Sequence, residues 1–443
     1  MTDQIDHLRQ ALDSGRQGPV QRVLSSLHPA EIAVLIESLP LGEREIVWNL
    51  VSDEDRGEVL LHLGEELRAW LIKAMDVEAV ISASEGLEID DLADFIDDLP
   101  ETLTQRVMSS MDEARRTRVE AVMSYPYDTA GGLMNTDPVS VRPNVTLEVV
   151  LRYLRMLGDL PSHTDMLFVV DRYGHFLGIL PMNKVVTMNP DVTVSDIMDR
   201  EFQALSVDLT AGEVAKRFED RDLISAPVVD ERNILLGRIT IDDVVDVIRD
   251  EAEHSLLAPA GLDEEDDIFA PVRRSARRRA VWLGVNLITA FMASAVVGMF
   301  EATLDQVVAL AVLMPIVASM GGIGGSQTLT LMIRGLALGQ ISTANAVALL
   351  KKEVAVALIN GLLWAVVVSG IVLAWFRSPM LALVIGMALI LNQMCASVAG
   401  VGLPLLLKKL DIDPALAGSV VLTTITDVVG FFAFLGLGAA LLL

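Results

Sequence analysis

The chain has 443 residues, is 52% hydrophobic and carries a formal net charge of −26. Charge and apolarity are segregated, since only six of its 60 acidic residues follow residue 272. An N-terminal half this acidic repels nucleic acid and gathers cations. The single cysteine, Cys395, excludes an intrachain disulfide framework and predicts a reducing compartment.

Residues 1–125 read as short amphipathic helices. The segments 27–40 and 89–100 share a pattern of acidic, aliphatic and alanine positions, and each ends in Leu-Pro. Such a repeat predicts a superhelical array of helix pairs.

Residues 134–250 contain a clearer duplication. The run Val169-Val170-Asp171 leads to Leu177-Gly178-Ile179, and 228–230 leads to 236–239 in the same way. Each copy predicts two strands joined by a turn and followed by a helix. Two tandem βαββα units of this kind resemble a pair of CBS domains, modules that commonly bind adenine nucleotides or ions. No phosphate-binding loop or dinucleotide fingerprint is present, so we expect neither a transport ATPase nor another enzyme.

A run of carboxylates follows the second unit. On a helix, Asp243, Asp246 and Asp250 share one face, with Asp242 beside them. Like charges stacked in this way destabilise a helix unless cations neutralise them. The run is therefore either a solvated acidic face or a cation sensor, and its place before the first apolar stretch favours the sensor.

Five apolar stretches occupy the C-terminal part, at roughly 280–300, 306–333, 343–376, 380–407 and 414–443. Each reaches the ~20 residues that a spanning helix needs. Clustered Arg and Lys lie before the first stretch, between the second and third, and between the fourth and fifth. The positive-inside rule therefore places the acidic half in the cytosol and the C-terminus outside.

Asp427 is the only formal charge between Pro414 and the chain end. A carboxylate at bilayer depth is costly and is usually part of an ion path. Hydroxyl-bearing neighbours, including Thr423, and Gly430 suit a wet, closely packed helix face. The alternative is a structural carboxylate that is hydrogen-bonded to a neighbouring helix.

The second stretch carries Pro315 and then four glycines within five residues, 321, 322, 324 and 325. This composition predicts interrupted helical backbone that lines a cavity, or else close helix packing through small residues. The amides of Asn286, Asn360, Asn392 and Gln393 are expected to form hydrogen bonds between helices.

The whole chain resembles the MgtE family of magnesium channels. The resemblance rests on Tyr125–Met134 (YPYDTAGGLM), Gly237–Ile248 (GRITIDDVVDVI), Met320–Gly335 (MGGIGGSQTLTLMIRG) and Asp413–Gly430 (DPALAGSVVLTTITDVVG). It implies a multidomain membrane protein that works as a homodimer in a bacterial inner membrane. The implied parts are a helical N domain (1–130), an α/β CBS pair (131–195 and 196–250), a plug helix with its linker (243–272) and a five-helix transmembrane domain (273–443).

The resemblance also implies site residues. Asp427 matches the pore carboxylate, which holds magnesium largely through its hydration shell. The pore would be lined by Gly321, Gly322, Gly324, Gly325, Ser419 and Thr423. Regulatory cation sites would use Asp243, Asp246, Asp250, Glu251, Asp90, Asp94, Asp222 and Asp413.

Several positions depart from the family pattern. Ile323, Ser326 and Ser419 replace asparagines near the pore, Thr210 and Gly212 replace acidic residues of the second CBS unit, and His254 and Ser255 replace acidic residues after the plug helix.

The expected function is magnesium influx that cytosolic magnesium shuts off, with Mg²⁺ as substrate and regulator and ATP as a candidate CBS ligand. Alternatives are a coupled transporter, a carrier for cobalt or manganese, and a nucleotide sensor that transports nothing.

Overall fold

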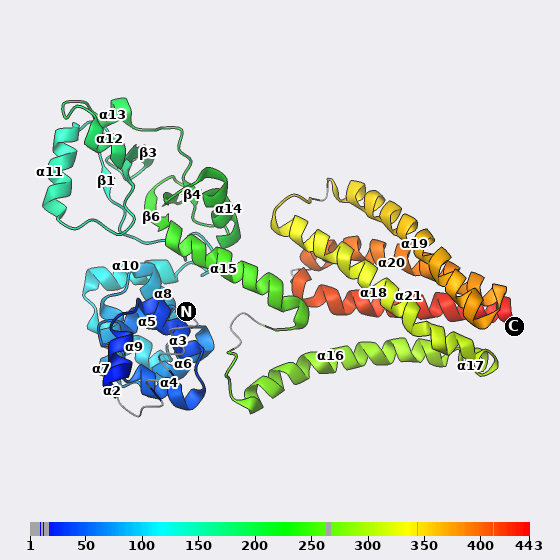
Figure 1. Cartoon of the computed structure of the whole chain (residues 1–443). Coiled ribbons are helices and arrows are strands. Elements are labelled where there is room, and N and C mark those ends of the chain that lie inside the picture. The colour runs from blue at the N-terminus through cyan, green and yellow to red at the C-terminus, as the bar shows by residue number, and fades with distance from the viewer. Residues whose placement is uncertain (1–8, 10–11, 13–16, 263–266, 343, 411) are drawn as a thin grey trace. The chain divides into compact units, whose positions relative to one another are not determined.

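The computed structural model describes residues 17–262, 267–342, 344–410 and 412–443, together with Arg9 and Leu12. The chain divides into two compact units (Figure 1). The first comprises residues 1–254 and 264–270, and the second comprises residues 255–263 and 271–443.

The first unit begins with short helices, as the repeat predicts. These are α2 (Gln17–Leu24), α3 (Pro29–Glu37), α4 (Leu41–Trp48), α5 (Arg56–Leu61), α6 (Glu65–Ala74), α7 (Val77–Glu85), α8 (Ile89–Asp97), α9 (Glu101–Ser110) and α10 (Glu113–Met123). Each Leu-Pro pair marks a boundary, because Pro40 and Pro100 are the N-caps of α4 and α9. The Asp76 and Asp112 side chains cap α7 and α10 by accepting backbone N–H groups. The predicted helical N domain is confirmed.

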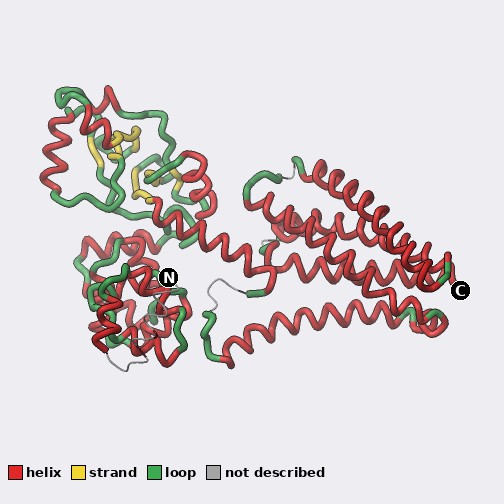
Figure 2. Tube along the Cα trace, viewed as in Figure 1, coloured by secondary structure: helices red, strands yellow, loops and turns green. Residues whose placement is uncertain are grey.

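The duplication is confirmed as two three-stranded sheets, which contain all the strands of the described chain (Figure 2). The elements in chain order are β1 (Ser140–Val141), α11 (Leu147–Leu157), β2 (Met166–Val170), β3 (Phe176–Pro181), α12 (Met182–Thr187), α13 (Val194–Ile197), β4 (Leu205–Ser206), α14 (Ala211–Arg221), β5 (Ser225–Val229), β6 (Leu235–Thr240) and α15 (Ile241–Leu257). In both sheets the first pair of strands is parallel and the second antiparallel. The register shifts at equivalent places, Val169/Val170 and Val228/Val229.

The N domain and the second CBS unit share one hydrophobic core. A single cluster of buried side chains extends from α2 through Phe95 of α8 to Phe218 of α14 and Val244 of α15. The start of α15 is therefore packed into the first unit.

A buried ion pair holds the segment that follows α15. The Arg44 side chain is fully buried, and its two terminal nitrogens contact the Asp267 carboxylate at 2.5 and 2.7 Å. Arg44 also donates to the carbonyls of Ile36 and Glu37, and it lies over the Phe269 ring. The connecting segment at 267–269 is thus anchored on the N domain.

The second unit holds the expected apolar helices. It contains the 3₁₀ turn η1 (Ala258–Ala260), α16 (Val272–Gly298), α17 (Glu301–Gln306), α18 (Val308–Ala337), α19 (Ala346–Phe376), α20 (Pro379–Lys409) and α21 (Pro414–Leu442). All of these helices except α17 are long and apolar enough to span a membrane. The chain is a multi-pass membrane protein.

Helix α20 is central within this unit. It packs on α18, α19 and α21. In its most apolar 18-residue stretch 61% is buried, against 6% for the corresponding stretch of α16. The expected interruption of the second span is wrong, because α18 is one helix that includes Pro315. The α20 amides support it: Asn392 Nδ2 donates to the Val317 carbonyl at 2.9 Å, and Gln393 Nε2 to the Met320 carbonyl at 2.8 Å.

Candidate functional site

Asp427 lies near the middle of α21, and its side chain is half-buried. Among the described residues its carboxylate has no hydrogen bond or ion pair, so nothing supports the structural alternative. Ser419 and Thr423 precede it at intervals of four residues, which places the three on one helix face. The Thr423 hydroxyl donates to the Ser419 carbonyl at 2.8 Å, which leaves its own oxygen lone pairs available. We call Ser419, Thr423 and Asp427 the polar stripe.

The turn η1 packs on α21 at one end of the polar stripe. The Ser419 hydroxyl donates to the Pro259 carbonyl at 3.1 Å, and Ala258 is buried. Ser419 is eight residues from Asp427, or about 12 Å along the helix. The segment directly after α15 therefore covers the stripe at the end where the Lys408–Lys409 pair precedes α21.

Three of the four α18 glycines face neighbouring helices within the chain. A Cβ on Gly321 would lie 2.1 Å from Asn392, one on Gly324 would lie 2.2 Å from Gln393, and one on Gly325 would lie 3.1 Å from Leu422. Gly322 alone has no neighbour within 4 Å. The packing explanation therefore accounts for three of these glycines, and pore lining by them stays a prediction.

Two departures from the family pattern, Ile323 and Ser326, lie on the exposed face of α18.

The predicted hydrogen bond between helices is not formed by Asn286 of α16. Its Nδ2 donates to Trp282 of its own helix rather than to a neighbouring one.

An acidic cluster forms between α8 and α15. Asp90 is buried, and its Oδ1 has no hydrogen-bond partner in the described part of the chain. Burial and then the nearby Asp243 raise the pKa of Asp90 well above its usual range. Burial and then Asp242 raise the pKa of Asp243 to about 8, and burial and then Glu88 raise that of Asp91 to about 7.

These carboxyls cannot all ionise cheaply without a compensating cation, because like charges are gathered in a region of low dielectric. Oxygen-only ligands suit Mg²⁺, which usually keeps several waters. Among the described residues, no three His, Cys, Asp or Glu side chains lie close enough together to hold a metal ion.

The outer part of the α15 face is partly neutralised. Arg249 pairs with Asp246 at 3.0 Å and with Asp250 at 3.2 Å. Burial still raises the pKa of Asp246, and Arg249 opposes that change. The expectation of a purely like-charged face overlooked Arg249, which lies within the run itself.

The other predicted site residues have surroundings of their own, although Asp94 also contributes to the raised pKa of Asp91. Burial raises the pKa of Asp94 to about 6; the nearby Arg68 opposes this increase, and Asp98 adds to it. Asp222 ends α14 in the left-handed region at φ 52°, and the Glu251 carboxylate lies near Gly212 at the opposite end of that helix. Asp413 caps α21 by accepting the backbone N–H groups of Ala415 and Leu416.

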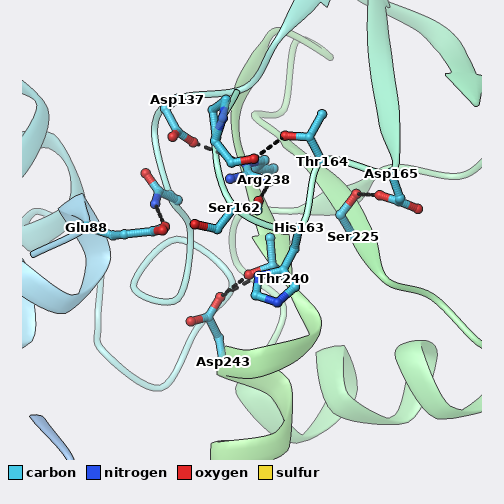
Figure 3. A network of polar contacts seen from close by, with 12 residues as sticks. Glu88, Asp137, Ser162, His163, Thr164, Asp165, Ser225, Arg238, Thr240 and Asp243 are labelled. Carbon is cyan, nitrogen blue, oxygen red and sulfur yellow. Dashed lines mark hydrogen bonds and ion pairs between the residues drawn. The ribbon is translucent and has the colours of Figure 1, made fainter. Parts of the chain in front are cut away.

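A polar network fixes the start of α15 against the two sheets (Figure 3). The buried Arg238 donates to Asp137 at 3.1 Å and to the Ser162 carbonyl at 2.8 Å. Two residues later, Thr240 donates its backbone N–H to Asp243. Hydrogen bonds thus connect the start of α15 to both CBS units.

The CBS pair also holds a cavity of about 410 Å³, open to solvent, where the two sheets meet. Its walls are formed by Phe176, Leu177, Arg200, Phe202, Gln203, Ala204, Val229 and Asn233. The Arg200 guanidinium at this open site suits an anionic ligand, whereas both amides already bond within the chain: Gln203 accepts from Arg221, and Asn233 donates to the Phe176 carbonyl.

Family models match most of the chain. The model described as the MgtE intracellular N domain matches residues 27–128, the CBS model matches 130–189 and 194–250, and the MgtE model, described as a divalent cation transporter, matches 314–437. A magnesium transporter MgtE from Thermus thermophilus is 32% identical over 440 residues, which cover 98% of both chains. The chain belongs to the MgtE family.

Two further similarities agree with this membership in the MgtE family. A magnesium transporter MgtE from Bacillus subtilis is 27% identical over 97% of this chain and 95% of that protein. A crystal structure of the cytosolic domain of the Mg²⁺ channel MgtE in complex with ATP is 33% identical, with a TM-score of 0.50. It covers 55% of this chain and 99% of that one.

Proposed function

We propose that the chain forms a magnesium-selective channel that admits Mg²⁺ across a bacterial inner membrane. It acts as a homodimer, with the N-terminal half in the cytosol. The observation that carries this proposal is the unpartnered Asp427 carboxylate at mid-span, aligned with Thr423 and Ser419 in the described part of the chain. A polar stripe of this kind can hold an ion through its water shell, which suits an ion that dehydrates reluctantly.

Gating follows from α15 and the turn after it. At high cytosolic Mg²⁺, hydrated ions neutralise the α8–α15 cluster and keep α15 docked, with η1 over the polar stripe. At low Mg²⁺ the carboxylates repel one another, α15 leaves the N domain, and the stripe is uncovered. Mg²⁺ favours the closed state because it binds that state more tightly.

The CBS pair adds nucleotide control in this proposal. The cavity beside Phe176 and Phe202 would take the base of an adenine nucleotide, and Arg200 would contact its phosphates. The ATP complex of the related cytosolic domain supports nucleotide binding by the corresponding half of this chain.

Flux into proteoliposomes tests the transport proposal. Wild-type protein should take up Mg²⁺ with no sodium or proton gradient, and Asp427→Asn should lose most of that uptake. Glu301→Gln, which neutralises an exposed carboxylate of α17, is the matched control and should conduct normally.

Other outcomes favour the alternatives. A need for a sodium or proton gradient indicates a coupled transporter, and faster Co²⁺ or Mn²⁺ uptake indicates a carrier for those metals. Normal flux through a folded Asp427→Asn variant rejects the pore assignment. No flux from a folded wild type leaves only the sensor alternative.

A further inference from the structure

Glu353 is a second carboxylate within the apolar helices, and the ion path proposed above does not use it. It lies eight residues into α19, and only 6% of its side chain is exposed. Its Oε1 contacts Lys352 Nζ at 2.8 Å, whereas the Lys352 side chain is 63% exposed. One end of this ion pair is therefore buried in the bundle.

The buried end of Glu353 meets α18. Its Oε2 accepts a hydrogen bond from the Thr328 hydroxyl at 3.4 Å. The same hydroxyl lies 3.3 Å from the Gly324 carbonyl, so it can donate to either acceptor. Glu353 thus contacts α18 one turn beyond the glycine segment.

Glu353 and Thr328 meet at one of the few places where α18 and α19 approach each other, while α20 packs on both helices. A Cβ on Gly400 of α20 would lie 2.9 Å from Thr328, so the absent side chain there admits Thr328 between the helices. Three helices thus meet at the Thr328 side chain.

A bundle needs no carboxylate merely to pack these helices, and a buried charge in a membrane segment carries a cost. The Thr328 contact is long for a hydrogen bond to a carboxylate, so it offsets little of that cost. The stabilising partner is Lys352, whose ammonium group offsets the carboxylate charge. The arrangement places the carboxylate end of this ion pair against Thr328 of α18.

We propose that Glu353 is a positioning residue for cation passage: it orients Thr328 and the glycine end of α18, and its fixed charge stabilises the cation on the cytosolic side of Asp427. The inference rests on the proposed channel function. It predicts that the rate of Mg²⁺ influx depends on the charge at position 353 as well as on the shape of the side chain. A residue that only links two helices would not show this dependence on charge.

The test is Mg²⁺ influx into proteoliposomes at matched protein incorporation. Glu353→Gln keeps the size of the side chain and an oxygen that can accept from Thr328, and it should slow influx by about tenfold. Glu353→Asp keeps the charge and should restore most of the rate. Lys351→Gln is the control for the neighbouring cation, since Lys351 forms no hydrogen bond or ion pair within the described chain.

A paired variant guards against misfolding, since the substitution Glu353→Gln alone would leave Lys352 without its partner. In E353Q/K352Q both charges are removed together and the pair can still hydrogen-bond. Slow influx from this folded variant supports the inference, and wild-type influx from either E353Q or the paired variant overturns it. If wild-type protein itself conducts no Mg²⁺, the channel proposal fails instead, so the two failures are distinct.

Discussion

Replacing Asp243 by Asn should make the first unit more stable at alkaline pH and less responsive to Mg²⁺. The Asn side chain keeps the shape and can still accept the Thr240 N–H. It removes the charge that faces Asp90 across the α8–α15 contact. The variant therefore isolates repulsion from packing.

The size of the effect follows from the raised pKa of Asp243, which goes from 3.8 to about 8. One pKa unit corresponds to about 1.4 kcal/mol, so ionising this carboxyl without a cation costs the folded unit on the order of 5 kcal/mol. For an acid whose folded pKa is raised, the cost is absent below pH ~4, grows as the pH rises and is complete above pH ~8. The wild-type unit should thus lose stability between these limits.

Calorimetry of residues 1–270 in EDTA, from pH 5 to pH 9, measures this loss. The related cytosolic domain has been crystallised on its own, which supports the use of the isolated unit. A change of 1 kcal/mol moves Tm by about 2–4 °C in a domain of 150–250 residues, so Asp243→Asn should melt about 10–20 °C above wild type at pH 9. At pH 5 the two proteins should differ far less.

Mg²⁺ should raise the Tm of the wild type at pH 8.5 more than at pH 6, because protons compete for the same carboxyls. The increase should be much smaller in Asp243→Asn. Asp220→Asn, at an exposed position of α14, should behave like wild type throughout. Parallel pH curves for the wild type and Asp243→Asn in EDTA would refute the reasoning.

Two further predictions use contacts within single units. Gly321→Ala should destabilise the detergent-solubilised protein by about 1–3 kcal/mol, because its Cβ would overlap Asn392, whereas Gly322→Ala should be nearly neutral; equal melting curves would show that α18 shifts freely. Arg44→Ala should cost about 3–5 kcal/mol, and a double-mutant cycle with Asp267→Ala should give a coupling of at least about 1 kcal/mol. Additive losses in that cycle would show that the buried pair contributes nothing of its own.

Sequence patterns predicted features that depend on local chemistry. Apolar length marked the spans, and an isolated charge marked Asp427. The prediction failed for α18, since Pro315 and the glycines disfavour a helix locally but α20 supplies the amides and the surface that stabilise one. Tertiary packing outweighed propensity there.

Pairings between distant positions could not be read from the sequence. Asp91 became a member of the acidic cluster only because α8 packs near α15, about 150 positions later in the chain. No sequence pattern singled out Glu353, and only the fold shows that it is buried beside Thr328. The partner of Arg44 lies 223 residues away.

The anchoring of Asp267 on Arg44 has a geometric consequence for the start of α16. Asp267 precedes Val272, the first residue of α16, by five residues, and an extended chain spans at most about 3.5 Å per residue. Because the pair holds Asp267 on Arg44, the Cα of Val272 can lie at most roughly 17 Å from the Cα of that anchored residue. If the N domain moves so far that this segment is fully extended, further movement must either displace the start of α16 or break the Arg44–Asp267 ion pair.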